Sequence, residues 1–145
     1  TALEKLNLQY NNFTGNLPSE IGQWGLLTIA SLGNNRFSGQ IPLETGSWGS
    51  MQTIDFRNNQ FYGTLPSEWS NLPYLETISL EGNFLTGTIP YEFNFMYQLT
   101  SLKVQSNDLS GDMPWGLCPG CYSVLELEAD CQQVFCDCCT MCYRE

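Results

Sequence analysis

The stretch "NNFTGNLPSE", residues 11–20, decides the fold because nearly the same residues return at a fixed distance. The later copies are "NNRFSGQIPLE" from residue 34, "NNQFYGTLPSE" from residue 58 and "GNFLTGTIPYE" from residue 82. Glycine and proline within each copy interrupt a helix or a long strand. One asparagine recurs at a constant interval, as Asn11, Asn35, Asn59, Asn83 and Asn107. Self-similarity at a fixed period predicts a solenoid of stacked turns.

Apolar residues occupy the same places around each of these asparagines. Three columns precede the asparagine: Leu3, Leu27, Met51, Leu75, Leu99; Leu6, Ala30, Ile54, Ile78, Leu102; and Leu8, Leu32, Phe56, Leu80, Val104. After it come an apolar residue, a glycine and an apolar residue followed by proline, as in Phe13, Gly15 and Leu17-Pro18. Each unit reads L-x-x-L-x-L-x-x-N. No single unit can enclose its own apolar residues, so neighbouring turns have to bury one another.

These columns resemble the leucine-rich repeat family. The tail G-x-(L/I)-P is similar to the plant-specific class of that family, found in receptor-kinase ectodomains and in inhibitors of pathogen polygalacturonases. The resemblance covers residues 1–114 as five repeats of equal length, without an insertion. It implies an α/β leucine-rich-repeat solenoid with short parallel β-strands on the concave face and loops, 3₁₀ or short helical turns on the convex face.

Two polar columns have structural interpretations. A buried asparagine side chain both donates and accepts, so the five periodic asparagines are expected to bond to the backbone of adjoining turns. Glu20, Glu44, Glu68 and Glu92 recur at the same interval as the asparagines. Carboxylates are favourable where a helical turn begins, because unpaired N–H groups lie there. A cation-binding acid ladder is the alternative for these glutamates.

The tail, residues 115–145, is expected to form a degenerate last repeat and a cap. Leu127 and Ala129 continue the apolar columns one residue late, and a terminal repeat needs a cover for its apolar face. All seven cysteines lie in this tail: Cys118, Cys121, Cys131, Cys136, Cys138, Cys139 and Cys142. Disulfides are the preferred interpretation, and a zinc-thiolate cluster in "CDCCTMC" is the alternative. Choosing the unpaired cysteine and then pairing six leaves 7 × 15 = 105 arrangements open.

Further features concern the compartment. The ending "LEADC…CxCCTxC" is similar to the cap of secreted leucine-rich-repeat proteins from algae. Disulfides imply an oxidising, extracellular or cell-surface setting reached through the secretory pathway. Asn12, in the sequon "NFT", is then a candidate glycosylation site. No capping segment precedes Leu3, so we expect the N-terminal cap to be absent and the chain to come from a longer one with further repeats upstream.

Composition argues against several classes of function. A net charge of −10 with only five basic residues makes nucleic acid and anionic membrane surfaces poor partners, and no apolar run is long enough to insert in a bilayer. Histidine is absent, which removes the commonest general base. No phosphate loop or metal triad appears. We therefore expect no catalytic residues, no cofactor and no metal, and hence not an enzyme.

Strand alternation predicts the residues of a binding surface on the concave face. These partner-binding candidates are Lys5, Asn7, Gln9, Tyr10, Ser31, Asn34, Asp55, Arg57, Asn58, Ser79, Glu81, Ser101, Lys103 and Gln105. Arg57, flanked by Asp55 and Glu81, is expected near the centre of any contact. The alternation also predicts that Leu80 and Phe56 are buried, whereas Ser79 and Asp55 are exposed.

Two functions fit this surface. The first is an extracellular recognition module that binds a protein, peptide or glycan through the concave face. The second is a structural component of a cell wall, an adhesive layer or a larger extracellular assembly, joined through the open first repeat or an unpaired cysteine. A concave face that is merely soluble is the alternative to both.

Overall fold

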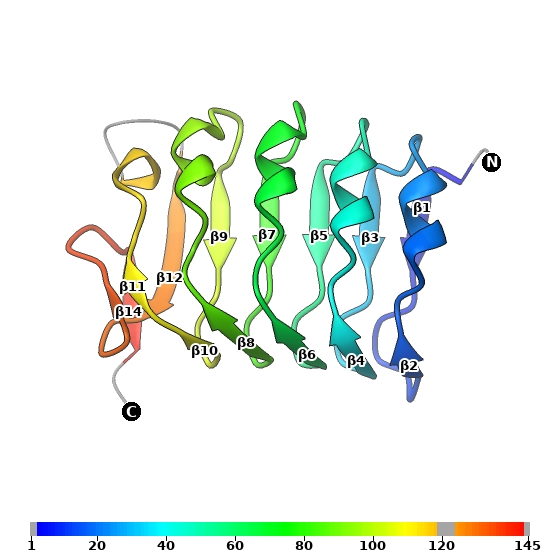
Figure 1. The fold of residues 1–145 in the computed structure, drawn as a ribbon, viewed down its shortest axis with the longest axis horizontal. Coiled ribbons are helices and arrows are strands. Elements are labelled where there is room, and N and C mark those ends of the chain that lie inside the picture. The colour runs from blue at the N-terminus through cyan, green and yellow to red at the C-terminus, as the bar shows by residue number, and fades with distance from the viewer. Residues whose placement is uncertain (1–2, 119–123, 144–145) are drawn as a thin grey trace.

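The computed structural model describes residues 3–118 and 124–143 and shows a solenoid whose turns stack side by side along one axis (Figure 1). The concave face is a parallel seven-stranded sheet in the order β1-β3-β5-β7-β9-β12-β14. Each of the first four pairings advances by one full repeat, so that Leu6 lies beside Ala30, and Ile54 beside Ile78. The strands are β1 (Lys5–Asn7), β3 (Ile29–Ser31), β5 (Thr53–Asp55), β7 (Thr77–Ser79), β9 (Ser101–Lys103), β12 (Glu126–Asp130) and β14 (Met141–Tyr143).

The convex side contains a second parallel sheet, where the sequence predicted only loops and short helical turns. Its order is β10-β8-β6-β4-β2. The strands are β2 (Thr14–Asn16), β4 (Arg36–Gln40), β6 (Gln60–Gly63), β8 (Phe84–Gly87) and β10 (Asp108–Leu109). They lie in the segments around the apolar residue and the glycine that follow the periodic asparagine. The glycines at these positions have positive φ, for example +87° at Gly39, which side chains rarely adopt.

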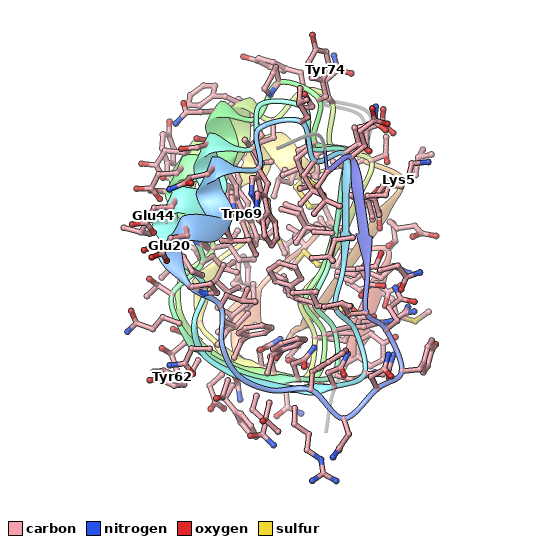
Figure 2. The ribbon with its side chains drawn as sticks, turned by 90° about the vertical axis from the view of Figure 1, so that its right-hand side faces the viewer. Lys5, Glu20, Glu44, Tyr62, Trp69 and Tyr74 are labelled. Carbon is pink, nitrogen blue, oxygen red and sulfur yellow. A yellow bond between two sulfur atoms is a disulfide. The ribbon has the colours of Figure 1, made fainter. Side chains whose placement is uncertain are left out.

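Short 3₁₀ helices complete the convex side, and each begins directly after the periodic proline. They are η1 (Ser19–Gln23), η2 (Leu43–Ser47), η3 (Ser67–Asn71), η4 (Tyr91–Phe95) and η5 (Trp115–Leu117). The periodic glutamates lie in the first turns of η1 to η4, as the helix-start interpretation predicted. Figure 2 shows Glu20 and Glu44 pointing outward from this layer, while Trp69 points into the interior.

The core is one continuous cluster between the two faces, and Leu80 and Phe56 are fully buried in it, as predicted. Two tryptophans on the convex side join successive turns. The indole nitrogen of Trp48 donates to the Ile21 carbonyl at 2.8 Å, and that of Trp69 donates to the Thr45 hydroxyl at 2.8 Å. The polar end of each buried indole is thus satisfied by the preceding turn.

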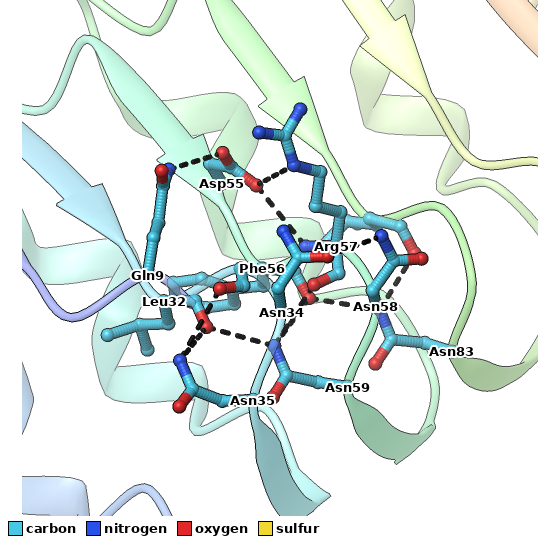
Figure 3. Close-up of polar contacts among 12 residues, drawn as sticks. Gln9, Leu32, Asn34, Asn35, Asp55, Phe56, Arg57, Asn58, Asn59 and Asn83 are labelled. Atoms are coloured by element: carbon cyan, nitrogen blue, oxygen red, sulfur yellow. Dashed lines mark hydrogen bonds and ion pairs between the residues drawn. The ribbon is translucent and has the colours of Figure 1, made fainter. Parts of the chain in front are cut away.

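The periodic asparagines bond backward along the solenoid (Figure 3). The Asn59 amide nitrogen donates to Leu32 O of the preceding turn and to Phe56 O of its own turn, both at 3.1 Å. Its side-chain oxygen accepts from Phe37 N at 3.0 Å. Asn35, Asn83 and Asn107 repeat this pattern and are buried, whereas Asn11 is exposed and bonds only to Leu8 O and Gln9 O.

Several small concave residues are buried, which corrects the predicted exposure. Ser79 and Asp55 are each only 8% exposed, so the prediction for both was wrong. Ser31, Ser101 and Gln105 are buried as well. Parallel strands lie only about 4.8 Å apart, so a short side chain sits between longer neighbours that cover it.

The cap extends the concave sheet and is cross-linked. β12 pairs with β9 in a register that is shifted by one residue from that of the repeats. Leu127 lies beside Leu102, as the shifted apolar pattern predicted. β14 then adds a strand that the sequence did not indicate. β13 (Val134–Phe135) pairs with β11 (Gly111–Asp112) on the other side. Three disulfides link Cys118 to Cys138, Cys131 to Cys142 and Cys136 to Cys139.

These bridges select one set of pairs among the many that the sequence allowed. Six cysteines are consumed by disulfides, which removes the thiolates that the zinc alternative required. Within the described residues, no group of three or more His, Cys, Asp or Glu side chains is arranged to hold a metal ion. The seventh cysteine, Cys121, lies outside the described residues.

Candidate functional site

The predicted concave site contains a polar cluster that crosses three turns of the solenoid (Figure 3). The Gln9 amide nitrogen, from the first turn, donates to Asp55 Oδ2 at 2.7 Å in the third turn. The other Asp55 oxygen lies 3.5 Å from Arg57 Nε. Asp55 therefore holds side chains from both directions, which explains why it is covered.

Gly33, between these turns, makes the cluster possible. A Cβ atom at Gly33 would lie 2.9 Å from Asp55 Oδ1 and 3.0 Å from Arg57 Cγ. Any side chain here would push the carboxylate and the guanidinium group away from the sheet. The glycine thus leaves a gap in the second turn that the Asp55 and Arg57 side chains fill.

Arg57 is anchored at one nitrogen and open at the others. Its ion pair with Asp55 uses Nε, and its side chain is 34% exposed. Among the residues described, no hydrogen bond or ion pair uses its two Nη nitrogens. A guanidinium group presents such paired N–H donors in the geometry that matches a carboxylate. Arg57 therefore offers an oriented two-pronged donor to a partner.

Two carboxyl groups beside Arg57 are affected by burial. Burial raises the pKa of Asp55 above its ordinary value, and the Arg57 charge opposes this shift. Burial also raises the pKa of Glu81, to which the negative charge of Asp55 adds, while Arg57 and Lys103 oppose it. Glu81 Oε2 is buried and has no hydrogen-bond partner in the described structure. Glu81 thus acts on Arg57 through charge and makes no ion pair with it, unlike the predicted flanking arrangement.

The charge of Lys103, a predicted partner-binding residue on the cap side, is already balanced by carboxylates of this chain. Its ammonium nitrogen lies 3.2 Å from Glu126 Oε2 and 3.2 Å from Glu128 Oε1. Burial opposes the charge, but the hydrogen bonds to these carboxylates outweigh burial and raise the pKa of Lys103 above its ordinary value. Glu128 also accepts from Gln105 at 2.8 Å and from the Tyr143 hydroxyl at 3.1 Å. The charged groups at this end of the face are paired internally, whereas Gln105 Oε1 is buried without a hydrogen-bond partner in the described structure.

Sequence reasoning missed Glu126, Glu128 and Tyr143 as concave residues. The signal for the two glutamates was present, because they alternate with the late apolar residues Leu127 and Ala129 on β12. No periodic signal marked Tyr143, since β14 lies beyond the last repeat.

At the opposite end, Tyr10 is presented in an unusual backbone conformation. Its φ is +56° and its side chain is 72% exposed. The equivalent positions are Asn34, Asn58, Gly82 and Ser106, all with positive φ. This conformation costs an L-residue about 1 to 2 kcal/mol, and aromatic residues rarely adopt it. An exposed tyrosine here contributes nothing to the core that offsets that cost.

The predicted residues therefore divide into three groups. The exposed ones are Lys5, Asn7, Tyr10 and Asn58; the half-buried ones are Gln9, Asn34, Arg57, Glu81 and Lys103; the buried ones are Ser31, Asp55, Ser79, Ser101 and Gln105. Asn58 donates to Asn34 at 3.0 Å, which fixes both amides. The part of the face able to accept a partner runs from Tyr10 to Arg57. Its groups suit binding by donors and an aromatic ring.

This geometry defines a repeat solenoid with one open, polar face. Comparison with known proteins identifies the repeats. The family model for the Leucine Rich Repeat matches residues 2–24, 50–72 and 74–96. The chain thus carries leucine-rich repeats and has a leucine-rich-repeat fold. No curated protein sequence matches it.

Solved structures of plant receptor ectodomains are similar to this chain. The LRR ectodomain of the membrane receptor kinase GASSHO1/SCHENGEN3 from Arabidopsis thaliana, in complex with CASPARIAN STRIP INTEGRITY FACTOR 2, has a TM-score of 0.83 and 31% identity over 97% of this chain. The HAESA ectodomain from Arabidopsis, in complex with an extended IDA peptide hormone ligand, has a TM-score of 0.80 and 31% identity over 88%. The BIR2 ectodomain from Arabidopsis thaliana has a TM-score of 0.76 and 30% identity over 81%.

This chain spans only part of each of these structures. It covers 18% of the GASSHO1/SCHENGEN3 chain, 22% of the HAESA chain and 62% of the BIR2 chain. Among the residues that the structure describes, no helix is both long and apolar enough to cross a membrane.

Proposed function

We propose that this chain is an extracellular recognition module that binds a peptide or protein segment through the concave face between Tyr10 and Arg57. The observation that carries the proposal is the Arg57 guanidinium group, which Asp55 holds through Nε while both Nη nitrogens are open. A carboxylate of the partner, either an acidic side chain or a chain terminus, can accept hydrogen bonds from both Nη nitrogens. Tyr10 supplies an aromatic contact at the other end.

The comparisons support a protein-binding role. Two of the similar ectodomains were solved with a factor or a peptide hormone bound. The extracellular setting is supported by the three disulfides, which persist in oxidising compartments. Asn12 is exposed and is available as a glycan acceptor in that setting. The plant-specific repeat class and the algal type of cap are part of this proposal, on the strength of the repeat tail and of the cysteine pattern.

Selection from a displayed peptide library tests the proposal. Random peptides are displayed on yeast, with free C-termini, and selected against the biotinylated chain. We expect the selected peptides to bind Arg57→Ala about tenfold or more weakly, because an oriented charge pair is lost. Glu68→Ala, on the convex side, is the matched control and should bind normally. Loss of binding in the Glu68 variant with normal binding in the Arg57 variant would place the interface on the convex side.

A further inference from the structure

A second surface, on the convex side next to the cap, carries exposed aromatic residues around a groove. The groove has a volume of about 650 Å³, and its floor is formed by Ile89 and Met113. Tyr91, Trp115 and Phe135 line it, and their residues are 65%, 59% and 65% exposed. They lie on η4, η5 and β13, which are neighbours at the cap end of the solenoid.

The repeats themselves show that the fold does not require these aromatic residues. Tyr91 and Trp115 occupy the position that is Ser19 in the first turn, Leu43 in the second and Ser67 in the third. η1 and η3 form normally with serine there. The equivalent pair in the first two turns is Ser19 and Leu43. Aromatic residues therefore stand at this position only in the two turns beside the cap, at a cost in exposed apolar surface.

The charge of the groove also departs from the repeat. Asp112 lines it, at the position occupied by Asn16, Gln40, Thr64 and Thr88 in the other turns. Within the described residues, the Asp112 carboxylate takes part in no ion pair or side-chain hydrogen bond, and no basic residue lines the groove. The groove therefore combines three aromatic rings with one uncompensated negative charge.

Local bonds hold the groove in shape. The Asn94 side chain donates to Tyr91 O at 2.9 Å and accepts from Gly116 N at 2.7 Å, so it ties η4 to η5. The disulfide from Cys118 to Cys138 then links the wall that carries Trp115 to the cap segment that follows Phe135. On that side, Met113 N donates to Phe135 O at 2.9 Å. A preorganised groove loses less entropy when it binds.

We propose that this groove binds a basic side chain, arginine or lysine, of a partner peptide or protein. Aromatic faces attract cations, best at tryptophan, and the long hydrocarbon stem of such a residue covers apolar surface. Asp112 supplies the counter-charge. The net charge of −10 favours a cationic partner over long distances. A sugar ring fits less well, because the Asn94 amide is already occupied and few polar groups are left to read its hydroxyls.

The test is an NMR titration of the ¹⁵N-labelled chain with the acetylated, amidated peptide Gly-Arg-Leu-Arg-Gly. We expect a saturable shift of the Trp115 indole N–H signal, weakened by salt because the contact is ionic. The same peptide with citrulline in place of arginine is uncharged, and it should bind at least about fivefold more weakly. Asp112→Asn should weaken binding of the arginine peptide by a similar factor.

The control variants use the sequence of the repeats. Trp115→Ser restores the residue found at the same position in two other turns, so it should fold normally and lose binding, followed at the Phe135 amide. Leu43→Ser, in the same column but distant from the groove, should bind as the unaltered chain does. Arg57→Ala should also leave this binding unchanged, which separates this site from the concave one.

Several results would overturn the proposal. Equal binding of the citrulline peptide, or no effect of Asp112→Asn, would remove the role of charge. A shift with cellohexaose and none with the arginine peptide would identify a sugar site. No saturable shift up to about 10 mM peptide, a concentration beyond the range of specific contacts, would contradict it. Self-association of the chain in sedimentation measurements, with Trp115 buried between the copies, would also contradict the proposal.

Discussion

The repeats and the cap close their turns with different chemistry. In the repeats, each buried periodic asparagine bonds to the turn before it, as Asn59 does to Leu32 O. In the cap, whose register is one residue late, the position equivalent to Asn107 is Gln132, and the adjacent Cys131 is bonded to Cys142. The contrast teaches that the amide ladder joins a turn to its neighbour only while the repeat continues. Where the repeat pattern ends, a covalent bond beside the asparagine position closes the turn.

The largest effect should come from breaking the ladder in its middle. Asn59→Ala leaves the buried Phe37 N without its acceptor, and it removes one of the two amide bonds at Leu32 O and at Phe56 O, which keep their bonds from Asn35 and Asn83. An unsatisfied buried N–H costs about 1 to 3 kcal/mol and each lost bond about 1 kcal/mol, so we expect a loss of about 3 kcal/mol in the free energy of unfolding. Urea denaturation measures it.

Asn11→Ala is the matched control for that variant. Asn11 is exposed, and Leu8 O still receives a bond from Asn35 at 2.8 Å when Asn11 is changed. The expected loss is below about 1 kcal/mol. Equal losses for Asn11 and Asn59 would show that the backward bonds carry no special weight.

Opening the cap should have the next largest effect. Replacing both Cys131 and Cys142 by serine removes a bridge across 11 residues, and we expect a loss of about 2 to 3 kcal/mol. Because a solenoid turn contacts only its neighbours, faster hydrogen exchange should appear in β12 and β14 and not in β3 or β5. Uniformly faster exchange would contradict this local view of the cap.

A smaller effect is expected at the left-handed position of the fourth turn. Gly82 has a φ of +70°, and an added Cβ would collide with the Asn58 side-chain oxygen. Gly82→Ala should therefore lower the free energy of unfolding by about 1 to 2 kcal/mol, measured by urea denaturation. Gly25→Ala, where a Cβ meets nothing within 4 Å, is the control. If both changes cost the same, the positive φ would not explain the choice of glycine.

The smallest effect concerns Glu81 and acts through pH. Burial raises its pKa above the ordinary 4.5, so its contribution to stability is complete below about that pH and is lost as the pH rises through the raised value. Glu81→Gln removes the charge, and it should stabilise the chain at pH 7 by about 0.5 kcal/mol. The difference from the unaltered chain should shrink at pH 4. A constant difference at both pH values would exclude the charge as its cause.

The features that follow the sequence repeat could be predicted. The second sheet, the strand β14 and the disulfide pairing could not. The burial of Leu80 and Phe56 and the shifted strand around Leu127 follow from columns of apolar residues. The second sheet was missed because its strands are short and lie beside glycines, and β14 was missed because it is not periodic. One sequence also cannot choose among cysteine pairings, since those depend on distances in the folded chain.

The candidate site shows the same division. Alternation placed Arg57 and Asp55 on the concave face, but it carried no information on how long side chains from separate turns meet. Gln9 bonds to Asp55 across the second turn, where Gly33 leaves room for the Asp55 carboxylate. Lys103 was predicted as a partner-binding residue, yet its ion-pair partners Glu126 and Glu128 come from the turn whose register is shifted by one residue.

The direction of the strands also determines how this domain responds to force. The strands run across the long axis of the solenoid, as Figure 1 shows. Tension applied between its two ends would load one row of interstrand hydrogen bonds at a time, so the turns should peel away singly at low force. The bridges among residues 118–142 would stop that peeling at the cap. We therefore expect the solenoid to extend turn by turn under load, while the cross-linked cap stays folded.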